Sequence, residues 1–168
     1  YIISKLLWDP NTDVDRHIQE FTDYYYGAGG VYIREYINTL CDKAEKDNIH
    51  VGFNDNPTSE LFSEEMLDQY DAILSKAEDA VAGDALRIRR VQKVRLSVRW
   101  VRIKRAAMLR GEHNTEEINT FFNDWNSFGL TRLDEWVSVH QTLRAFLEDK
   151  WRGTEYLNHW TDDRVEII

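Results

Sequence analysis

Apolar residues recur along most of the chain at spacings of three and four, which is the period of an amphipathic α-helix. The pattern predicts helices over residues 1–8, 13–26, 30–47, 63–82, 85–110, 115–128 and 131–151. Short connections make neighbouring helices run in opposite directions. We therefore expect an all-α fold, an antiparallel bundle of about seven helices, in a single domain over residues 1–168.

Residues that favour helix ends mark several of these boundaries. Thr12 or Asp13 can cap the second helix, Ser63 can cap the fourth, and Asn114 with Glu117 forms a capping box for the sixth. The last helix is expected to begin at Thr131, with Asp134 three residues later. Glycines at positions 27, 83 and 129 are expected to end the helices that precede them.

The glycine-rich stretch Tyr26–Gly30 superficially resembles a phosphate-binding loop. It follows a helix and not a strand, and it lacks the Lys-Ser/Thr pair of a nucleotide-binding loop. We expect it to be a corner between two helices.

The segment Ala85–Arg110 fits two kinds of secondary structure. Leu96–Trp100 alternates as a half-buried strand would, and the segment contains several β-branched residues. A helical series of apolar residues runs through the same segment: Val91, Val94, Val98, Val101 and Met108. One wide apolar helix face explains this series and the alternation together, so we predict a helix.

Charge is distributed unevenly along the chain. The formal net charge is −9, which disfavours nucleic acid as a main partner. Between Ala85 and Arg110, however, there are ten basic residues and no acidic one. This strip could bind an anionic polymer, or it could be neutralised by acidic helices of the same fold. We favour neutralisation and expect no nucleic-acid partner.

Composition narrows the class of protein further. The chain has 42% hydrophobic residues and 21 aromatic residues, too many for a disordered segment. No apolar run approaches the roughly 18 residues that span a bilayer, so we expect no membrane partner. A single cysteine, Cys41, excludes a disulfide within the chain, and we expect Cys41 on the inward face of its helix.

Residues capable of catalysis or metal binding are scattered. The five histidines lack the spacing that presents two ligands on one helix face, and no nucleophile elbow is present. Acid pairs such as Glu64-Glu65 and Asp68-Asp71 fit solvated helix faces better than a glycosidase site. We predict no catalytic residue, no cofactor and no metal site, and so no enzyme activity of this chain alone.

Most aromatic residues are expected in the core because they fall on apolar stripes: Trp8, Tyr24, Tyr25, Tyr26, Trp125, Trp136 and Trp151. Tyr1, Tyr32 and Trp160 are expected to be exposed. Exposed aromatic rings stack on sugars and anchor protein interfaces. Our candidates for glycan or domain-interface contacts are these three residues, Tyr1, Tyr32 and Trp160, together with Trp8 at the end of the first helix.

The opening residues Tyr1–Trp8 read like the middle of a helix, which suggests a piece of a longer protein. Its apolar residues Ile2, Ile3, Leu6, Leu7 and Trp8 are expected to point both toward the bundle and away from it. We expect an apolar patch on this helix and self-association through Tyr1–Trp8 in the isolated chain.

Three stretches near the start, 1–15 (YIISKLLWDPNTDVD), 21–29 (FTDYYYGAG) and 31–36 (VYIREY), resemble a bacterial family of unknown function. In that family the segment follows a glycoside-hydrolase-like (β/α)8 barrel, akin to those of α-glucuronidases and β-N-acetylhexosaminidases. The resemblance implies that residues 1–10 are the last helix of an upstream barrel and that residues 11–168 form a helical bundle. It also implies a periplasmic or extracellular location, and places any catalytic residues upstream. Gly29-Gly30 departs from the family's usual Pro/Ala-containing corner.

Two classes of function remain open at this stage. The first is a non-catalytic helical C-terminal module of a carbohydrate-active protein, which stabilises or shapes the substrate cleft of the upstream barrel. Its partners would be that barrel and possible carbohydrate. The second is an independent helical adaptor that binds a protein or an anionic polymer through its basic helix.

Overall fold

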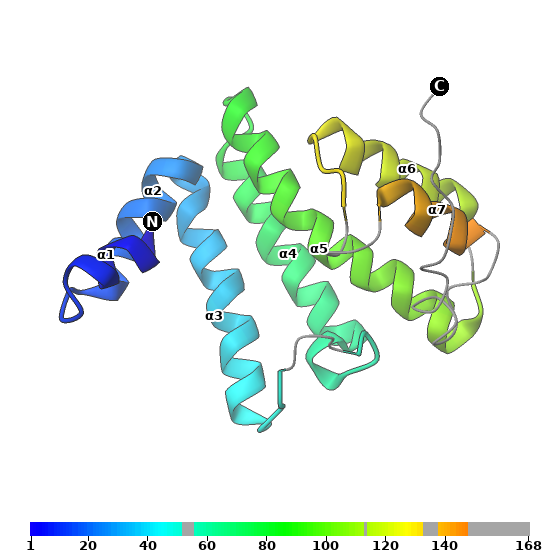
Figure 1. Ribbon diagram of the computed structural model, residues 1–168, viewed down its shortest axis with the longest axis horizontal. Helices are drawn as coiled ribbons and strands as arrows, with labels where there is room; N and C mark the ends of the chain where they lie inside the picture. Colours follow the sequence, from blue (N-terminus) through cyan, green and yellow to red (C-terminus); the bar gives the residue numbers. More distant parts are fainter. Residues whose placement is uncertain (52–55, 113, 133–137, 148–168) are drawn as a thin grey trace. The chain divides into compact units, whose positions relative to one another are not determined.

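The computed structural model describes residues 1–51, 56–112, 114–132 and 138–147, and these residues form an all-α fold (Figure 1). Its elements, in chain order, are α1 (Ile2–Trp8), α2 (Val14–Tyr26), the 3₁₀-helix η1 (Gly27–Gly29), α3 (Gly30–Lys46), the 3₁₀-helix η2 (Glu60–Phe62), α4 (Glu64–Ala80), α5 (Ala85–Arg110), α6 (Thr115–Ser127) and α7 (Val139–Leu147). In these ranges the only β-type pairing is an isolated bridge between Arg132 and Ser138. The predicted all-α class is confirmed.

Side-chain caps begin the helices where the sequence indicates them. The Asp13 carboxylate accepts a hydrogen bond from the backbone N–H of Arg16 at 3.0 Å, which settles the choice between Thr12 and Asp13. Asn114 caps α6 through the N–H of Glu117 at 3.1 Å. These bonds satisfy N–H groups that have no partner inside the helix.

Two glycines allow the sharp corner between α2 and α3. Gly27 has a φ of 57°, a left-handed conformation that side chains disfavour. At Gly30 a Cβ atom would lie 2.6 Å from the carbonyl oxygen of Thr22, so the two helices can approach closely only with glycine there. Across the corner, Arg34 donates to the hydroxyl of Thr22 and pairs with Asp23. The prediction of a helix–helix corner is confirmed.

The chain divides into two compact units, Tyr1–Arg102 and Ile103–Ile168, with the division inside α5. The structure does not test whether these two units fold as one domain, so the single domain over residues 1–168 stays a prediction. In the first unit α3, α4 and the first part of α5 run in alternating directions (Figure 1). Their covered faces meet in a core cluster: Ile33, Leu67, Tyr70, Leu74, Ala77, Val81, Val91 and Val98.

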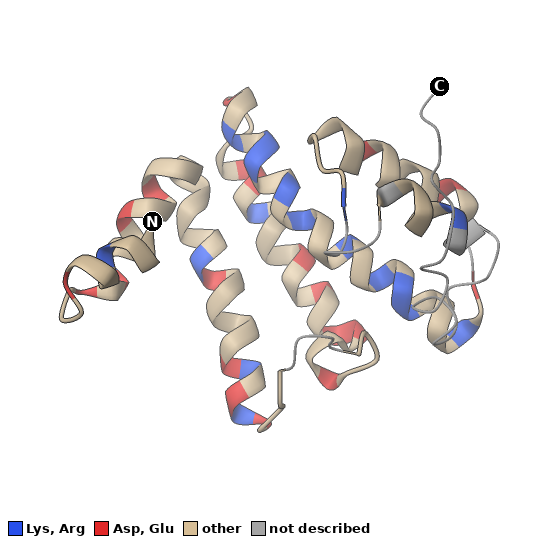
Figure 2. Ribbon diagram, in the orientation of Figure 1, with Lys and Arg blue, Asp and Glu red and all other residues tan. Residues whose placement is uncertain are grey.

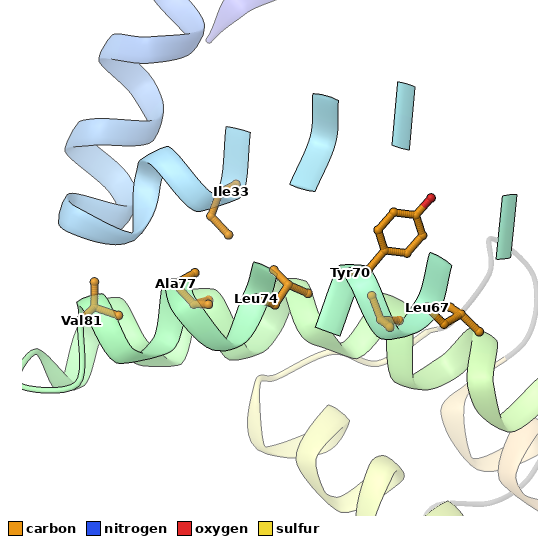
Figure 3. Close-up of a cluster of buried hydrophobic side chains, with 8 residues drawn as sticks. Ile33, Leu67, Tyr70, Leu74, Ala77 and Val81 are labelled. Carbon is orange, nitrogen blue, oxygen red and sulfur yellow. The ribbon is translucent and has the colours of Figure 1, made fainter. Parts of the chain in front are cut away.

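Tyr70 shows how tightly this core encloses even a polar side chain. It lies on α4 among Leu67, Leu74 and Ala77, with Ile33 of α3 above that helix (Figure 3). Its hydroxyl donates to the carbonyl oxygen of Leu61 at 3.1 Å. Burial raises the pKa of Tyr70 to about 12, because the apolar surroundings disfavour the charged phenolate.

The basic segment is a helix, as predicted, and not a strand. Val91, Leu96 and Val98 are buried, whereas Arg95 and Arg102 are half-buried. The long arginine stems can therefore cover apolar neighbours while their guanidinium groups reach acidic side chains.

The second unit contains α6 and α7, which pack on each other. Phe121 and Phe122 are buried there and meet edge to face, with ring centroids 5.3 Å apart. The predicted start of the last helix at Thr131 is wrong, because α7 begins at Val139. Ser138 and Gln141 form a capping box at that point, the Ser138 hydroxyl accepting from the Gln141 N–H and the Gln141 side chain accepting from the Ser138 N–H.

Candidate interaction surface

The short helix α1 has one side against α2 and one side open to solvent. None of its seven residues is buried. Ile2 and Leu6 are half-buried where α1 packs on α2, whereas Ile3, Leu7 and Trp8 are 74%, 83% and 92% exposed. The sequence predicted that these five residues point partly toward the bundle and partly away from it, and the structure shows which residues lie on each side. We call Ile3, Leu7 and Trp8 the α1 face.

Tyr1 anchors the beginning of α1 to α2. Its ring stacks on Phe21 with centroids 6.0 Å apart and meets His17 edge to face. Its hydroxyl donates to the Glu20 carboxylate at 3.3 Å. Lys5 lies over the same ring, 5.4 Å from its centroid. Tyr1 is 54% exposed, as predicted, but its ring already has partners within the chain.

A polar network continues this anchor into the turn between α1 and α2. The His17 ring lies 2.8 Å from the Thr12 hydroxyl through Nε2 and 3.1 Å from Glu20 through Nδ1. Hydrogen bonds from Arg16 and His17 lower the pKa of Glu20, so this carboxylate is charged at neutral pH. The network fixes the turn that precedes α2.

Aromatic contacts then connect α2 to α5. The rings of Phe21 and Tyr25 stack with centroids 5.4 Å apart. The Arg90 guanidinium lies 4.0 Å from the Tyr25 ring centroid and donates to the Tyr25 carbonyl oxygen at 2.7 Å. One side of α1 is thus held through α2 to the body of the first unit, while the α1 face stays open.

Three acidic residues flank the α1 face in sequence: Asp9, Asp13 and Asp15. All three are exposed. Among the described residues, Asp9 accepts a hydrogen bond from the backbone N–H of Asn11 and Asp13 accepts one from the backbone N–H of Arg16. In the described part of the chain, none of the three forms an ion pair with a basic side chain. We call them the acidic flank.

Basic positions on α5, by contrast, lie along acidic positions on α4 (Figure 2), and several of their side chains form ion pairs. Arg95 pairs with Asp71 at 2.8 Å and with Glu78 at 2.9 Å. Arg102 pairs with Asp68 and Asp71, both at 2.8 Å. Partial burial acts to lower the pKa of Arg102, but its hydrogen bonds to Asp68 and Asp71 outweigh burial and raise it. For these arginines the predicted neutralisation within the fold is confirmed.

The three predicted site residues that the structure describes, Tyr1, Trp8 and Tyr32, have different surroundings. Tyr1 and Trp8 lie at the two ends of α1. Tyr32 was predicted to be exposed, but it is half-buried against the core cluster. Trp160 lies outside the described residues. The structure therefore leaves Trp8 as the strongest contact candidate of the four.

Three further exposure predictions were wrong. Trp8 and Tyr24 were expected in the core but are 92% and 81% exposed. Tyr24 precedes two more tyrosines, and three consecutive helical residues cannot share one face because they project about 100° apart. Cys41 was expected to face inward but is exposed, one position beyond Leu40 on the packed stripe of α3.

Other chemistry in the described residues is sparse. A cavity of about 250 Å³ is lined by Ala28, Ala80, Val81, Gly83, Asp84 and Arg87. Its two charged residues pair with each other at 2.6 Å, and hydrogen bonds from Arg87 lower the pKa of Asp84. No cluster of His, Cys, Asp and Glu in the ranges given above could hold a metal ion. None of the described helices has the length and apolar character needed to cross a bilayer.

Comparison with known proteins gives one match. Residues 1–38 match the model of a family described only as a domain of unknown function (DUF4838). No curated protein and no solved structure matches the chain. The predicted resemblance to a family of unknown function is thus confirmed over the segment that forms α1, α2, η1 and half of α3.

The matched segment is also where apolar side chains are most exposed. Of the twelve large hydrophobic residues that are exposed in the described ranges, eight lie within residues 1–38: Tyr1, Ile3, Leu7, Trp8, Phe21, Tyr24, Val31 and Ile37. Single exposed hydrophobic residues are ordinary on protein surfaces, but a concentration of them marks an interaction surface.

Proposed function

We propose that this chain is a non-catalytic helical module that docks, through the α1 face, on a glycoside-hydrolase-like barrel located upstream in the same polypeptide. The concentration of exposed hydrophobic residues in the family-matched segment carries this proposal. In it, α1 serves as the last helix of the barrel, and the remainder of the first unit supports the barrel from one side.

The energetics of the α1 face support docking. Trp8 is almost completely exposed, and tryptophan is a frequent anchor of protein interfaces because a buried indole contributes a large apolar area. Ile3 and Leu7 lie four residues apart on the same side of α1, so one partner surface can cover them together. If a partner buried Ile3 and Leu7 fully, each side chain would contribute roughly 1.5–3 kcal/mol to the free energy of docking.

A supporting role fits the remaining chemistry better than catalysis does. Asp68 and Asp71, which the sequence suggested as a carboxylate pair, are held by arginines of α5. The same ion pairs oppose the alternative of an adaptor that binds an anionic polymer through α5, because an incoming polyanion would have to compete with these carboxylates. A periplasmic or extracellular location is part of the proposal and follows from the family resemblance.

Enzyme assays test the proposal. The full polypeptide, the polypeptide without residues 1–168, and the isolated chain are assayed on aryl glycosides that include glucuronides and N-acetylhexosaminides. We expect no turnover by the isolated chain. Removing it should lower the melting temperature of the parent protein and leave its kcat nearly unchanged. A raised KM with kcat retained would indicate that the module also shapes the substrate cleft.

Two results would contradict the proposal. One is turnover by the isolated chain that is abolished in Glu64→Gln or Asp68→Asn. The other is a parent gene that encodes no barrel strands upstream of Tyr1. Asp42→Asn, an exposed substitution on α3, is the matched control for the amide variants.

A further inference from the structure

The acidic flank specifies what kind of surface can cover the α1 face. Trp8 is followed at once by Asp9, and Asp13 and Asp15 come within the next seven residues. A partner that takes up the Trp8 indole therefore meets Asp9 in the adjacent position, and Asp13 and Asp15 follow across the tight turn in which the Thr12 N–H bonds to the Asp9 carbonyl oxygen at 3.1 Å. Removing a carboxylate from water costs free energy unless a cation or a hydrogen-bond donor replaces the lost water.

Within the described residues, the chain's own contacts do not supply those cations. Other exposed acids of the same region do have basic partners, since Glu20 pairs with Arg16 and Asp23 pairs with Arg34. The carboxylates of the acidic flank have only backbone N–H donors or no hydrogen bond at all in the described residues. Their charges are therefore available to a partner.

We propose that the surface of the upstream domain that covers the α1 face is an apolar pocket for Trp8 with a rim of lysine and arginine side chains facing the acidic flank. This inference rests on the proposed function and adds the chemistry of the partner. The rim cations offset the desolvation of the three carboxylates, and an arginine beside Trp8 can also stack on the indole ring.

Hydrogen–deuterium exchange in the full polypeptide tests the rim. The backbone N–H of Asp9 bonds to the carbonyl of Lys5 at 2.9 Å, so the amides at the end of α1 report whether the helix is formed and covered. Exchange is measured at about 0.05 M and about 0.5 M NaCl, because salt screens exposed charge pairs strongly at the higher concentration.

The test variant is the triple change Asp9→Asn, Asp13→Asn and Asp15→Asn. Asparagine caps helices as well as aspartate does, so the triple variant removes charge but keeps the cap of α2. The control variant carries the changes Asp42→Asn, Glu45→Gln and Asp79→Asn, at exposed positions on α3 and α4. Both variants change the net charge by the same amount.

The expected result is a loss of α1 protection of about tenfold in the test variant at low salt, little difference from wild type at high salt, and no effect of the control variant. Equal protection in wild type and test variant at low salt would overturn the basic rim. Trp8→Ala separates the two proposals, because it should reduce protection at both salt concentrations. If Trp8→Ala has no effect either, docking itself fails, and with it the proposed function.

Discussion

Helices α1 and α4 have the same kind of apolar pattern in sequence, but their apolar faces lie in opposite environments. In α4 the residues at helical spacing are buried: Leu67, Tyr70, Ile73, Leu74 and Ala77. In α1 no residue is buried. The difference shows that periodicity identifies the apolar face of a helix but does not say whether anything within the chain covers it.

Charged residues repeat this contrast. Asp71 of α4 meets both Arg95 and Arg102, whereas Asp15, in the first turn of α2, has no basic partner in the described residues. Within the first unit the apolar face of α4 is therefore covered and the charge of Asp71 is paired. In the described residues the α1 face has no cover and the acidic flank has no basic partner, as expected if this surface docks on the partner proposed above.

The same substitution in the two helices should have the most unequal effect. Leu74→Ala should lower the free energy of unfolding by about 2–5 kcal/mol, because Leu74 is fully buried and its loss leaves a cavity. Leu7→Ala should change it by less than about 0.5 kcal/mol in the isolated chain, since Leu7 is exposed. Urea unfolding of residues 1–168 measures both. Equal losses would contradict the division between covered and open helices.

The second largest effect should be a loss of stability at alkaline pH, which arises in the core around Tyr70. The folded-state pKa of Tyr70 is raised from 10.0 to about 12. A raised folded-state pKa means that the stabilising contribution is complete below pH 10 and is lost as the pH rises toward 12. The loss should approach roughly 3 kcal/mol, because the pKa rises from 10.0 to about 12 and each pKa unit is worth about 1.4 kcal/mol.

Absorbance of tyrosinate during a pH titration checks this prediction. Burial also raises the pKa of Tyr26 and Tyr36, but Tyr70 should ionise last and together with unfolding in the wild type, and this last step should disappear in Tyr70→Phe. A late step that persists in Tyr70→Phe would assign it to another residue.

Neutralising Asp71, which has arginine partners, should cost more stability than neutralising Asp15, which has none in the described residues. The difference should be smaller than the effects above. Asp71→Asn should lower the free energy of unfolding by about 1–2 kcal/mol, because two arginines lose a charged partner. Asp15→Asn should leave it within about 0.5 kcal/mol. The Asp71 effect should shrink in 0.5 M salt, where screening weakens ion pairs. Similar effects of the two substitutions would remove the contrast in charge.

A charge on the α1 face should have the smallest effect on stability but a clear effect on self-association. Leu7→Glu should leave the unfolding midpoint nearly unchanged but reduce self-association of the isolated chain, because it places a charge on the α1 face. Light scattering at several concentrations measures the association. Glu35→Gln, at an exposed position on α3, is the control. A wild-type chain that is strictly monomeric would contradict the predicted patch.

Local sequence signals predicted most of the helices well. The apolar series in the basic segment identified α5 against a strand alternative, and Asp13 and Asn114 marked helix starts because capping depends on a few neighbouring residues. The start of α7 was missed because Thr131 and Asp134 imitate a cap, whereas Ser138 and Gln141 supply the actual one.

Exposure was harder to predict because it depends on residues far away in sequence. Tyr32 is half-buried since the core cluster reaches it, and Trp8 is exposed since α2 covers the other side of α1. The missing cations around the acidic flank also could not be read from the sequence, because the arginines that pair with Asp71 are more than twenty residues away.

Hydroxyl-radical footprinting of the α1 face tests the central claim most directly. Oxidation of Leu7 and Trp8 is measured in the isolated chain and in the full polypeptide, with Leu86 of α5, which is exposed and lies outside the matched segment, as an internal reference. The account predicts that Leu7 and Trp8 are readily oxidised in the isolated chain and protected by about fivefold or more in the full polypeptide, as expected for side chains at the centre of an interface. Equal oxidation of Trp8 in the two proteins would contradict the account.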